Sequence, residues 1–269
     1  MSAIPILISL LCLGQVPADS AKANVPKAEA PASEASLKVL QARVETTQVS
    51  VAKVAGRTAK LVEKPVFRYS DELRRIEDAG MWLWTERGQP VAAMKVEKYQ
   101  AARFPIPWLY CFTSLSSELV DAEWTTAKPF HAKQPGVTWQ ALSDDPAMAR
   151  AARLIQMRDI ARRFSVELLR DAAGTDRTQM RLLTRPLFRC DETPEVLDGA
   201  VFGFTGTGTN PDVLLLLDLP PKGGWRFGIA GMTAEGVSVK LNEKVVAEIP
   251  HTAGRGNVFD NWCNFHPNK

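Results

Sequence analysis

Two glutamates are the strongest candidates for catalytic chemistry in this chain. Glu118 and Glu235 hold equivalent places in two similar stretches of sequence, each after a run of apolar residues. Two carboxyl groups that face one cleft can act as general acid and general base. The pattern therefore predicts a carboxylate site for a hydrolase as one hypothesis, although a duplication explains the match without any function.

Metal, phosphate and nucleophile motifs are missing from the sequence. The three histidines, His131, His251 and His266, do not have the spacing of zinc ligands, so neither a metal nor a cofactor is expected. The serines at 114–117 lack the Gly-x-Ser-x-Gly elbow that exposes a nucleophile. The segment 206–209 is rich in glycine, but a strand is expected after it and no Walker lysine is present, so a hairpin loop is the preferred interpretation.

Aromatic side chains give the second set of candidates. Tryptophans near loops combine a broad apolar surface with one hydrogen-bond donor, a combination that suits binding surfaces. We therefore predict binding roles for four of them, Trp108, Trp124, Trp139 and Trp225. Alternating aromatic pairs within strands, Trp82 with Trp84 and Phe202 with Phe204, fit a covered core better than an exposed platform.

An internal repeat organises these candidates. Residues 59–68 recur 121 positions later as residues 180–189, with apolar and basic positions in the same order around a Pro-x-Phe-Arg motif. The likeness continues from 78–85 to 198–205, and it carries Glu118 onto Glu235. Similar composition is the alternative explanation, but the matching order of elements favours duplication.

The repeat predicts an α+β fold. Each copy reads as an antiparallel β-meander, and two such units are expected to form one curved sheet or incomplete barrel; a tandem of two small domains is the alternative. Strands 81–84 and 213–217 are apolar on both faces, so both faces must be covered. The predicted strands are 59–63, 66–69, 80–85, 91–99, 108–114, 119–124 and 137–142 in the first copy, and 180–184, 187–190, 200–205, 213–219, 225–232, 237–241 and 245–249 in the second.

One long amphipathic helix is predicted between the copies, over residues 145–171. Pro146 suits a first helical turn, Gly174 can end the helix, and apolar residues recur at helical spacing from Leu154 to Leu168. Arginines on the remaining positions alternate with acids, which is typical of a solvated face.

The domain boundaries follow from composition. We predict a signal peptide because an apolar stretch precedes a small-residue cleavage pattern, and a disordered linker because the next segment has little to bury. The chain is therefore expected to be exported to the periplasm, the cell envelope or the medium, without a transmembrane span once mature. The predicted parts are 1–18 signal peptide, 19–36 linker, 37–250 duplicated domain (copies 57–142 and 178–250, helix 145–171) and 251–269 C-terminal tail.

The net charge disfavours one class of partner, and the sequence contexts of the cysteines predict which thiols are buried. The formal net charge is +3 and no basic block occurs, which disfavours nucleic-acid binding. Cys111 and Cys190 lie in apolar contexts typical of buried thiols, whereas Cys263 is expected to be accessible. Their disulfide pairing is left open.

The chain resembles a group of uncharacterised exported proteins of planctomycete-type bacteria. The resemblance covers most of residues 61–249 and rests on the Trp82-Leu-Trp-Thr strand, the 155–164 helix and the 198–202 strand. It implies export and a single fold, and it carries no catalytic residue with it.

Three functions remain as hypotheses. A non-enzymatic exported protein that binds a ligand or an envelope partner comes first, because reactive residue types are sparse. A hydrolase that uses Glu118 or Glu235 and a structural component of the cell envelope are the alternatives. The repeat matches least in 98–107, 125–136 and 206–210, where an activity is therefore expected.

Overall fold

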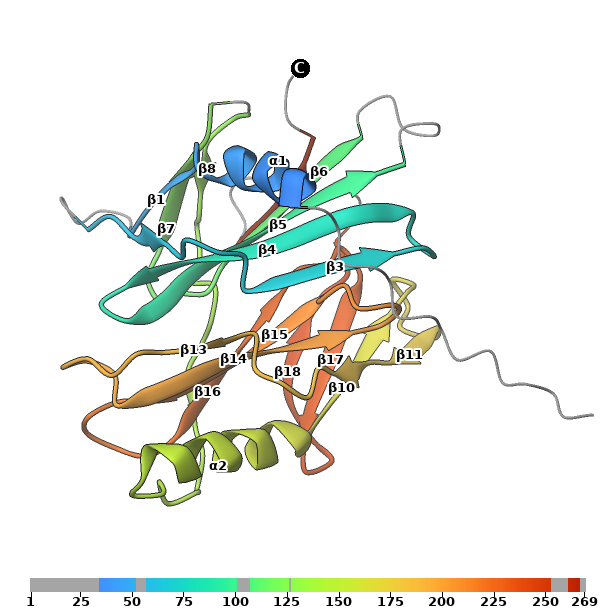
Figure 1. Cartoon of the computed structure of the whole chain (residues 1–269). Helices are drawn as coiled ribbons and strands as arrows, with labels where there is room; N and C mark the ends of the chain where they lie inside the picture. The colour runs from blue at the N-terminus through green and yellow to red at the C-terminus, as the bar shows by residue number, and fades with distance from the viewer. Residues whose placement is uncertain (1–33, 52–56, 101–106, 126, 253–260, 267–269) are drawn as a thin grey trace, which may run out of the picture. The chain divides into compact units, whose positions relative to one another are not determined.

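The computed structural model describes residues 34–51, 57–100, 107–125, 127–252 and 261–266, which belong to one compact unit, Ala32–Lys269. The predicted signal peptide and all but the last three residues of the predicted linker lie outside the described residues. The described part is rich in antiparallel sheet with two helices, so the α+β class is confirmed (Figure 1). No helix in it has the length and apolar character needed to cross a membrane.

A helix and eight strands make up the first half of the described chain, residues 34–131. The longest strands form a hairpin closed by Arg87 and Gly88, whose φ values of 51° and 82° suit a two-residue turn between twisted strands. The elements are α1 (Glu34–Val44), β1 (Gln48–Val51), β2 (Lys60–Leu61), β3 (Phe67–Asp71), β4 (Ile76–Glu86), β5 (Gln89–Tyr99), β6 (Trp108–Ser114), β7 (Val120–Glu123) and β8 (Phe130–His131).

The second half has the same order of elements apart from one extra short strand. It is preceded by β9 (Gln140–Ala141) and followed by β19 (Trp262–Phe265). Its elements are α2 (Arg150–Arg162), β10 (Phe164–Leu169), β11 (Arg177–Gln179), β12 (Arg181–Leu182), β13 (Phe188–Arg189), β14 (Asp198–Thr205), β15 (Val213–Leu219), β16 (Arg226–Gly231), β17 (Gly236–Leu241) and β18 (Lys244–Ile249).

Two six-stranded sheets form the centre of the unit. One has the order β19-β6-β5-β4-β2 with β3 also on β4, and the other has the order β12-β14-β15-β16-β9 with β13 also on β14. Two smaller sheets, β1-β7-β8 and β11-β10-β17-β18, lie outside this pair. The prediction of one curved sheet is therefore wrong, because the strands divide into four sheets.

Successive side chains of the central strands point to opposite faces, and this alternation explains how the sheets stack. In β4, Met81 and Leu83 point to a core shared with Val201 and Leu216 of the other central sheet. Trp82 and Trp84 point the other way, into a core made with α1, β1 and β7. The second sheet repeats this arrangement, with Phe202 and Phe204 facing α2, β10 and β17. The prediction that both faces of these strands are covered is confirmed.

The predicted helix over 145–171 is too long. The helix ends at Arg162, and the next residues alternate between buried and half-buried positions as β10, which pairs with β17. Residues 164–169, Phe-Ser-Val-Glu-Leu-Leu, alternate apolar and polar side chains at first, as a strand does. Their apolar residues also fit helical spacing, but pairing with β17 stabilises the strand. Gly174, with φ +68°, lies in the turn after β10 instead of ending the helix.

Helix α2 packs on β10 and β14 and so belongs to the second half, while α1 packs on β4 and β5 of the first. The predicted linker, 19–36, overlaps α1, which begins at Glu34.

The two central sheets exchange edge strands. β9, expected to complete the first copy, pairs with β16 of the second sheet. The predicted C-terminal tail, 251–269, contains β19, which pairs with β6 of the first sheet. The strand that follows the first half in sequence thus completes the second sheet, and the strand that follows the second half completes the first sheet. The shared core also makes a tandem of two separate domains a poor description.

Candidate functional site

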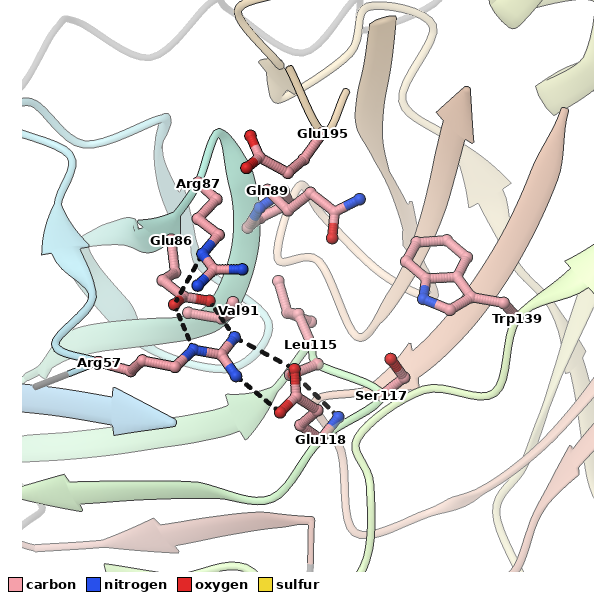
Figure 2. A pocket seen from close by; sticks show the side chains of 12 residues that line it. Arg57, Glu86, Arg87, Gln89, Val91, Leu115, Ser117, Glu118, Trp139 and Glu195 are labelled. Carbon is pink, nitrogen blue, oxygen red and sulfur yellow. Dashed lines mark hydrogen bonds and ion pairs between the residues drawn. The ribbon is translucent and has the colours of Figure 1, made fainter. Parts of the chain in front are cut away.

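A pocket of about 160 Å³ opens beside the β4–β5 hairpin. Its walls come from that hairpin, from the loop after β6, from Arg57 and from two segments of the chain beyond residue 131, so residues distant in sequence meet there (Figure 2). The lining residues are Arg57, Glu86, Arg87, Gln89, Pro90, Val91, Leu115, Ser116, Ser117, Glu118, Trp139 and Glu195.

Arg57 is the electrostatic centre of this pocket. Its guanidinium donates four hydrogen bonds, two to Glu86 at 2.5 Å each and two to Glu118 at 2.8 and 3.1 Å. Such bidentate pairing fixes both carboxylates (Figure 2). The hydrogen bonds from Arg57 lower the pKa of Glu86, and burial opposes the effect only in part. Glu86 is consequently held as a carboxylate.

The far wall is held by contacts within the second sheet. The ring of Trp139 lies over the Arg226 guanidinium, with 4.6 Å from the guanidinium carbon to the ring centroid. Arg226 itself pairs with Asp218 at 2.6 Å. Asp218 also accepts a hydrogen bond from the Gln89 amide at 3.1 Å, which ties the hairpin to this wall.

The two predicted catalytic glutamates are placed differently. Glu118 lines the pocket with a side chain that is 52% exposed, while Glu235 is not among the lining residues. Glu235 follows β16, and its Oε2 atom is buried without a hydrogen-bond partner among the described residues. Of the two predicted catalytic glutamates, only Glu118 therefore lines this pocket.

The four predicted binding tryptophans also differ in burial and in position. Trp139 lines the pocket, whereas Trp225 is fully buried and donates its indole N–H to Gln156 at 2.9 Å. Trp124 is buried and stacks on the Phe265 ring at 4.5 Å. Trp108 is half-buried beneath the Arg43 guanidinium at 3.8 Å. Trp124 and Trp225 therefore pack in the cores, and of the four tryptophans only Trp139 lines the pocket.

A buried cluster of charges was not predicted. Lys95 and Glu97 on β5 are 2% and 3% exposed, yet both carry ionisable groups. The Lys95 ammonium donates to Asn210 Oδ1 at 2.9 Å, to the Pro211 carbonyl at 3.0 Å and to the Met232 carbonyl at 3.2 Å. These bonds satisfy all three of its protons, which is the condition for burying an ammonium group.

Carboxylates complete this cluster. Glu97 accepts hydrogen bonds from the Tyr69 hydroxyl at 2.7 Å and from Asn210 at 3.1 Å. Asp212, 1% exposed, is held by Arg74 through two bonds of 2.8 and 2.6 Å. Burial and the neighbouring Glu97 raise the pKa of Tyr69, so its hydroxyl remains a donor. Every group named here is engaged, which indicates a structural role.

The regions in which the repeat matches least do not form the pocket. None of the lining residues lies in 98–107, 125–136 or 206–210; residues 101–106 and 126 are outside the described part. Instead, 206–210 leads into the buried charge cluster through Asn210. An alternation of Lys95 and Glu97 within an apolar strand was the signal in the sequence that could have revealed this cluster.

The three thiols in the described part of the chain offer no accessible nucleophile. Cys111, Cys190 and Cys263 are free and buried, so the predicted accessibility of Cys263 is wrong because β19 inserts it into a core. Burial raises the pKa of Cys111 and Cys190 to about 12. Among the described residues no group of three or more His, Cys, Asp or Glu side chains is arranged to hold a metal ion.

Comparison with known proteins gives no relative to set beside this geometry. No protein-family model matches the chain, and neither a curated protein nor a solved structure is significantly similar to it.

Proposed function

We propose that this protein is an exported, non-enzymatic binding protein whose pocket at Arg57, Glu118 and Trp139 holds a small polar ligand. The observation that carries the proposal is the pairing of Arg57 with Glu86 and Glu118 on the pocket wall. A general acid needs a carboxyl with a raised pKa, and the pKa of Glu86 is lowered. Burial raises the pKa of Asp218, but both of its oxygens are engaged, by Arg226 and by Gln89. Preorganised ionised groups suit recognition of a polar ligand better than proton transfer.

The proposal includes an origin of the fold by duplication. Its support is the equivalence of pairing in the two central sheets: Leu61 faces Trp84 where Leu182 faces Phe204, and Phe67 faces Met81 where Phe188 faces Val201. Two ion pairs also correspond, Arg68 with Asp78 at 2.8 Å and Arg189 with Asp198 at 2.7 Å. The repeating unit inferred from this order starts at a helix, so it is larger than the meander expected from sequence.

Hydrogen bonds between the halves agree with the same duplication. Gln89 of the first half donates to Asp218 of the second, and Asn210 of the second donates to Glu97 of the first. The two donors, Gln89 and Asn210, are 121 positions apart in the sequence, and so are the two acceptors, Glu97 and Asp218. Such reciprocal contacts are expected of two copies related by a pseudo-twofold axis.

Export is the proposed location, by way of the signal peptide at 1–18 and the linker that follows it. The support is the apolar stretch and the small-residue cleavage pattern of the sequence. Sequencing of the N-terminus of the protein recovered from outside the cytoplasm tests it. A new N-terminus near residue 19 is expected, and an intact Met1 on cytoplasmic protein would contradict export.

Binding is tested by a thermal-shift screen of small polar metabolites, followed by calorimetry on each hit. A ligand present at 100 times its dissociation constant adds about 2.7 kcal/mol to the stability of the folded protein, which is enough to raise the melting temperature measurably. Ser117→Arg introduces a bulky side chain at an exposed lining position and is expected to weaken binding at least tenfold.

The matched control is Ser143→Arg, at an exposed serine that is not among the lining residues. It is expected to bind the hit as the wild type does. Hits whose affinity is the same in both variants would place binding elsewhere, and conversion of the ligand during a day of observation by NMR would reject the non-enzymatic part of the proposal.

A further inference from the structure

The charge of the pocket favours a cationic ligand. Three carboxylates, Glu86, Glu118 and Glu195, line it against two guanidinium groups, Arg57 and Arg87, which gives a formal charge of −1 in a chain whose net charge is +3. Four of the hydrogen bonds that Arg57 can donate are already used within the wall. The acceptors that remain belong to Glu118, Glu195 and Gln89, while the Arg87 guanidinium, 60% exposed and 3.7 Å from Glu86, is a second cation among the lining residues.

The two outer carboxylates hold most of this acceptor capacity. Glu118 is half-exposed, and each of its oxygens accepts one hydrogen bond from Arg57, which leaves further lone pairs. Glu195 is exposed, and no ion pair joins it to another described residue. Gln89 donates its amide to Asp218, so its carbonyl oxygen remains as another acceptor.

The proposed duplication gives the pocket a counterpart beside the β14–β15 hairpin, and there the side chain of Arg74 supplies a cation. Glu195 lies in the turn between β13 and β14, 121 positions after Arg74 in the turn between β3 and β4. The Arg74 guanidinium lies against the 206–212 hairpin, where it binds Asp212 at 2.6 and 2.8 Å and Thr207 at 3.2 Å. At the pocket, an exposed acid replaces this arginine, and the space beside the hairpin is open.

The size and the apolar part of the pocket limit the ligand. A volume of about 160 Å³ is roughly that of five water molecules at about 30 Å³ each. Trp139 supplies apolar surface to the pocket, whereas Val91 and Leu115, 5% and 0% exposed, contribute little. A short alkyl chain with charged ends matches both features.

We propose that the pocket binds a small alkyl ligand with an ammonium group at each end, with Glu118 accepting hydrogen bonds from one ammonium group, Glu195 from the other, and Trp139 contacting the methylene groups. This inference rests on the proposed binding function and names its ligand class. Arg57 acts as a positioning residue that holds Glu86 and Glu118 in place.

Calorimetric titration with three four-carbon probes of different charge tests the inference. The probes are 1,4-diaminobutane, 1,4-butanediol and succinate, applied at up to 10 mM to the wild type and to three variants: Glu118→Gln, Glu195→Gln and the control Glu248→Gln. Glu248 is exposed on β18 and is not a lining residue. The diamine is expected to bind at least tenfold more tightly than the other two probes.

The variants complete the test. Glu118→Gln and Glu195→Gln are each expected to weaken the binding of 1,4-diaminobutane by about tenfold, while Glu248→Gln leaves it unchanged. Absence of binding by the diamine, equal or tighter binding of succinate or butanediol, or an equal loss in the control overturns the inference. The proposed binding function fails separately, if the metabolite screen yields no ligand that Ser117→Arg excludes.

Discussion

Arg57 shows how a single side chain shapes the pocket. It connects Glu86 on the hairpin with Glu118 in the loop after β6, residues between which the chain forms two strands, β5 and β6. Its side chain and that of Glu86 are 18% and 11% exposed, so the pair is partly shielded from solvent and interacts more strongly than a surface pair. Its loss affects both the shape of the pocket and the stability of the fold.

Glu86→Gln is expected to reduce the free energy of unfolding at pH 7 by about 2 kcal/mol, because a hydrogen bond between charged groups becomes a weaker one. The pKa of Glu86 in the folded protein lies below the ordinary value of 4.5. Its contribution to stability is therefore present above pH 4.5 and is lost as the pH falls through the lower folded value. Urea unfolding of both proteins from pH 7 to pH 3 measures this difference.

The difference between the two proteins should shrink at the acidic end of that range. Glu248→Gln serves as the control, since Glu248 is exposed on an edge strand, and it should differ little from the wild type at any pH. A Glu86→Gln effect that stays constant down to pH 3 would mean that the carboxylate is not the source of the stability.

At the same scale, the sequence predicted Glu118 and Trp139 but missed their companions. Both could be chosen from their own type and neighbours: an acid that follows serines, and a tryptophan near a loop. Arg57 and Glu86 are recognisable only as a pair, and they are 29 residues apart in the chain. Contacts of this kind depend on the packing of strands, which the local pattern does not contain.

Among the elements, the strands of the central sheets were predictable and their partners were not. β4, β5, β14 and β15 combine apolar runs with clear turns, so their positions follow from local sequence. β9 and β19 are short, and each pairs with a sheet of the other half. β10 looked helical because its apolar residues also continue the helical spacing of α2, and only pairing with β17 decides between the two.

β19 is the element whose contribution is most easily measured. Phe265 stacks on the buried Trp124 at 4.5 Å and meets the Tyr110 ring edge-on at 5.2 Å. Phe265→Ala is expected to cost about 2 to 3 kcal/mol, less than the 3 to 5 kcal/mol of a fully buried phenylalanine, because Phe265 is half-buried. Urea denaturation followed by tryptophan fluorescence measures the loss.

Val245→Ala is the control for that substitution. Val245 also lies on a terminal strand of a sheet, β18, but it is 49% exposed, so a change below about 0.5 kcal/mol is expected. Equal small effects in both variants would show that β19 adds little to the stability of the first central sheet.

For the whole molecule, the decisive feature is the core between the central sheets. Met81, Leu83 and Ala93 of one sheet pack with Leu214 and Leu216 of the other, and all five are buried. Each such leucine or methionine contributes about 1.5 to 3 kcal/mol when it is removed from water. Neither half can cover these side chains alone.

Separate expression of residues 34–142 and 143–269 tests this dependence. Each fragment contains only one of the two central sheets. The first fragment also lacks β19, an edge strand of its sheet, and the second fragment lacks β9, an edge strand of its own sheet. Each alone is expected to bind a hydrophobic dye and to unfold without a cooperative transition, because the shared core is exposed. Co-expression is expected to give a one-to-one complex with a cooperative transition. If either fragment alone unfolds cooperatively as a monomer, the halves are independent domains, and the exchange of β9 and β19 adds to a fold that each half already possesses.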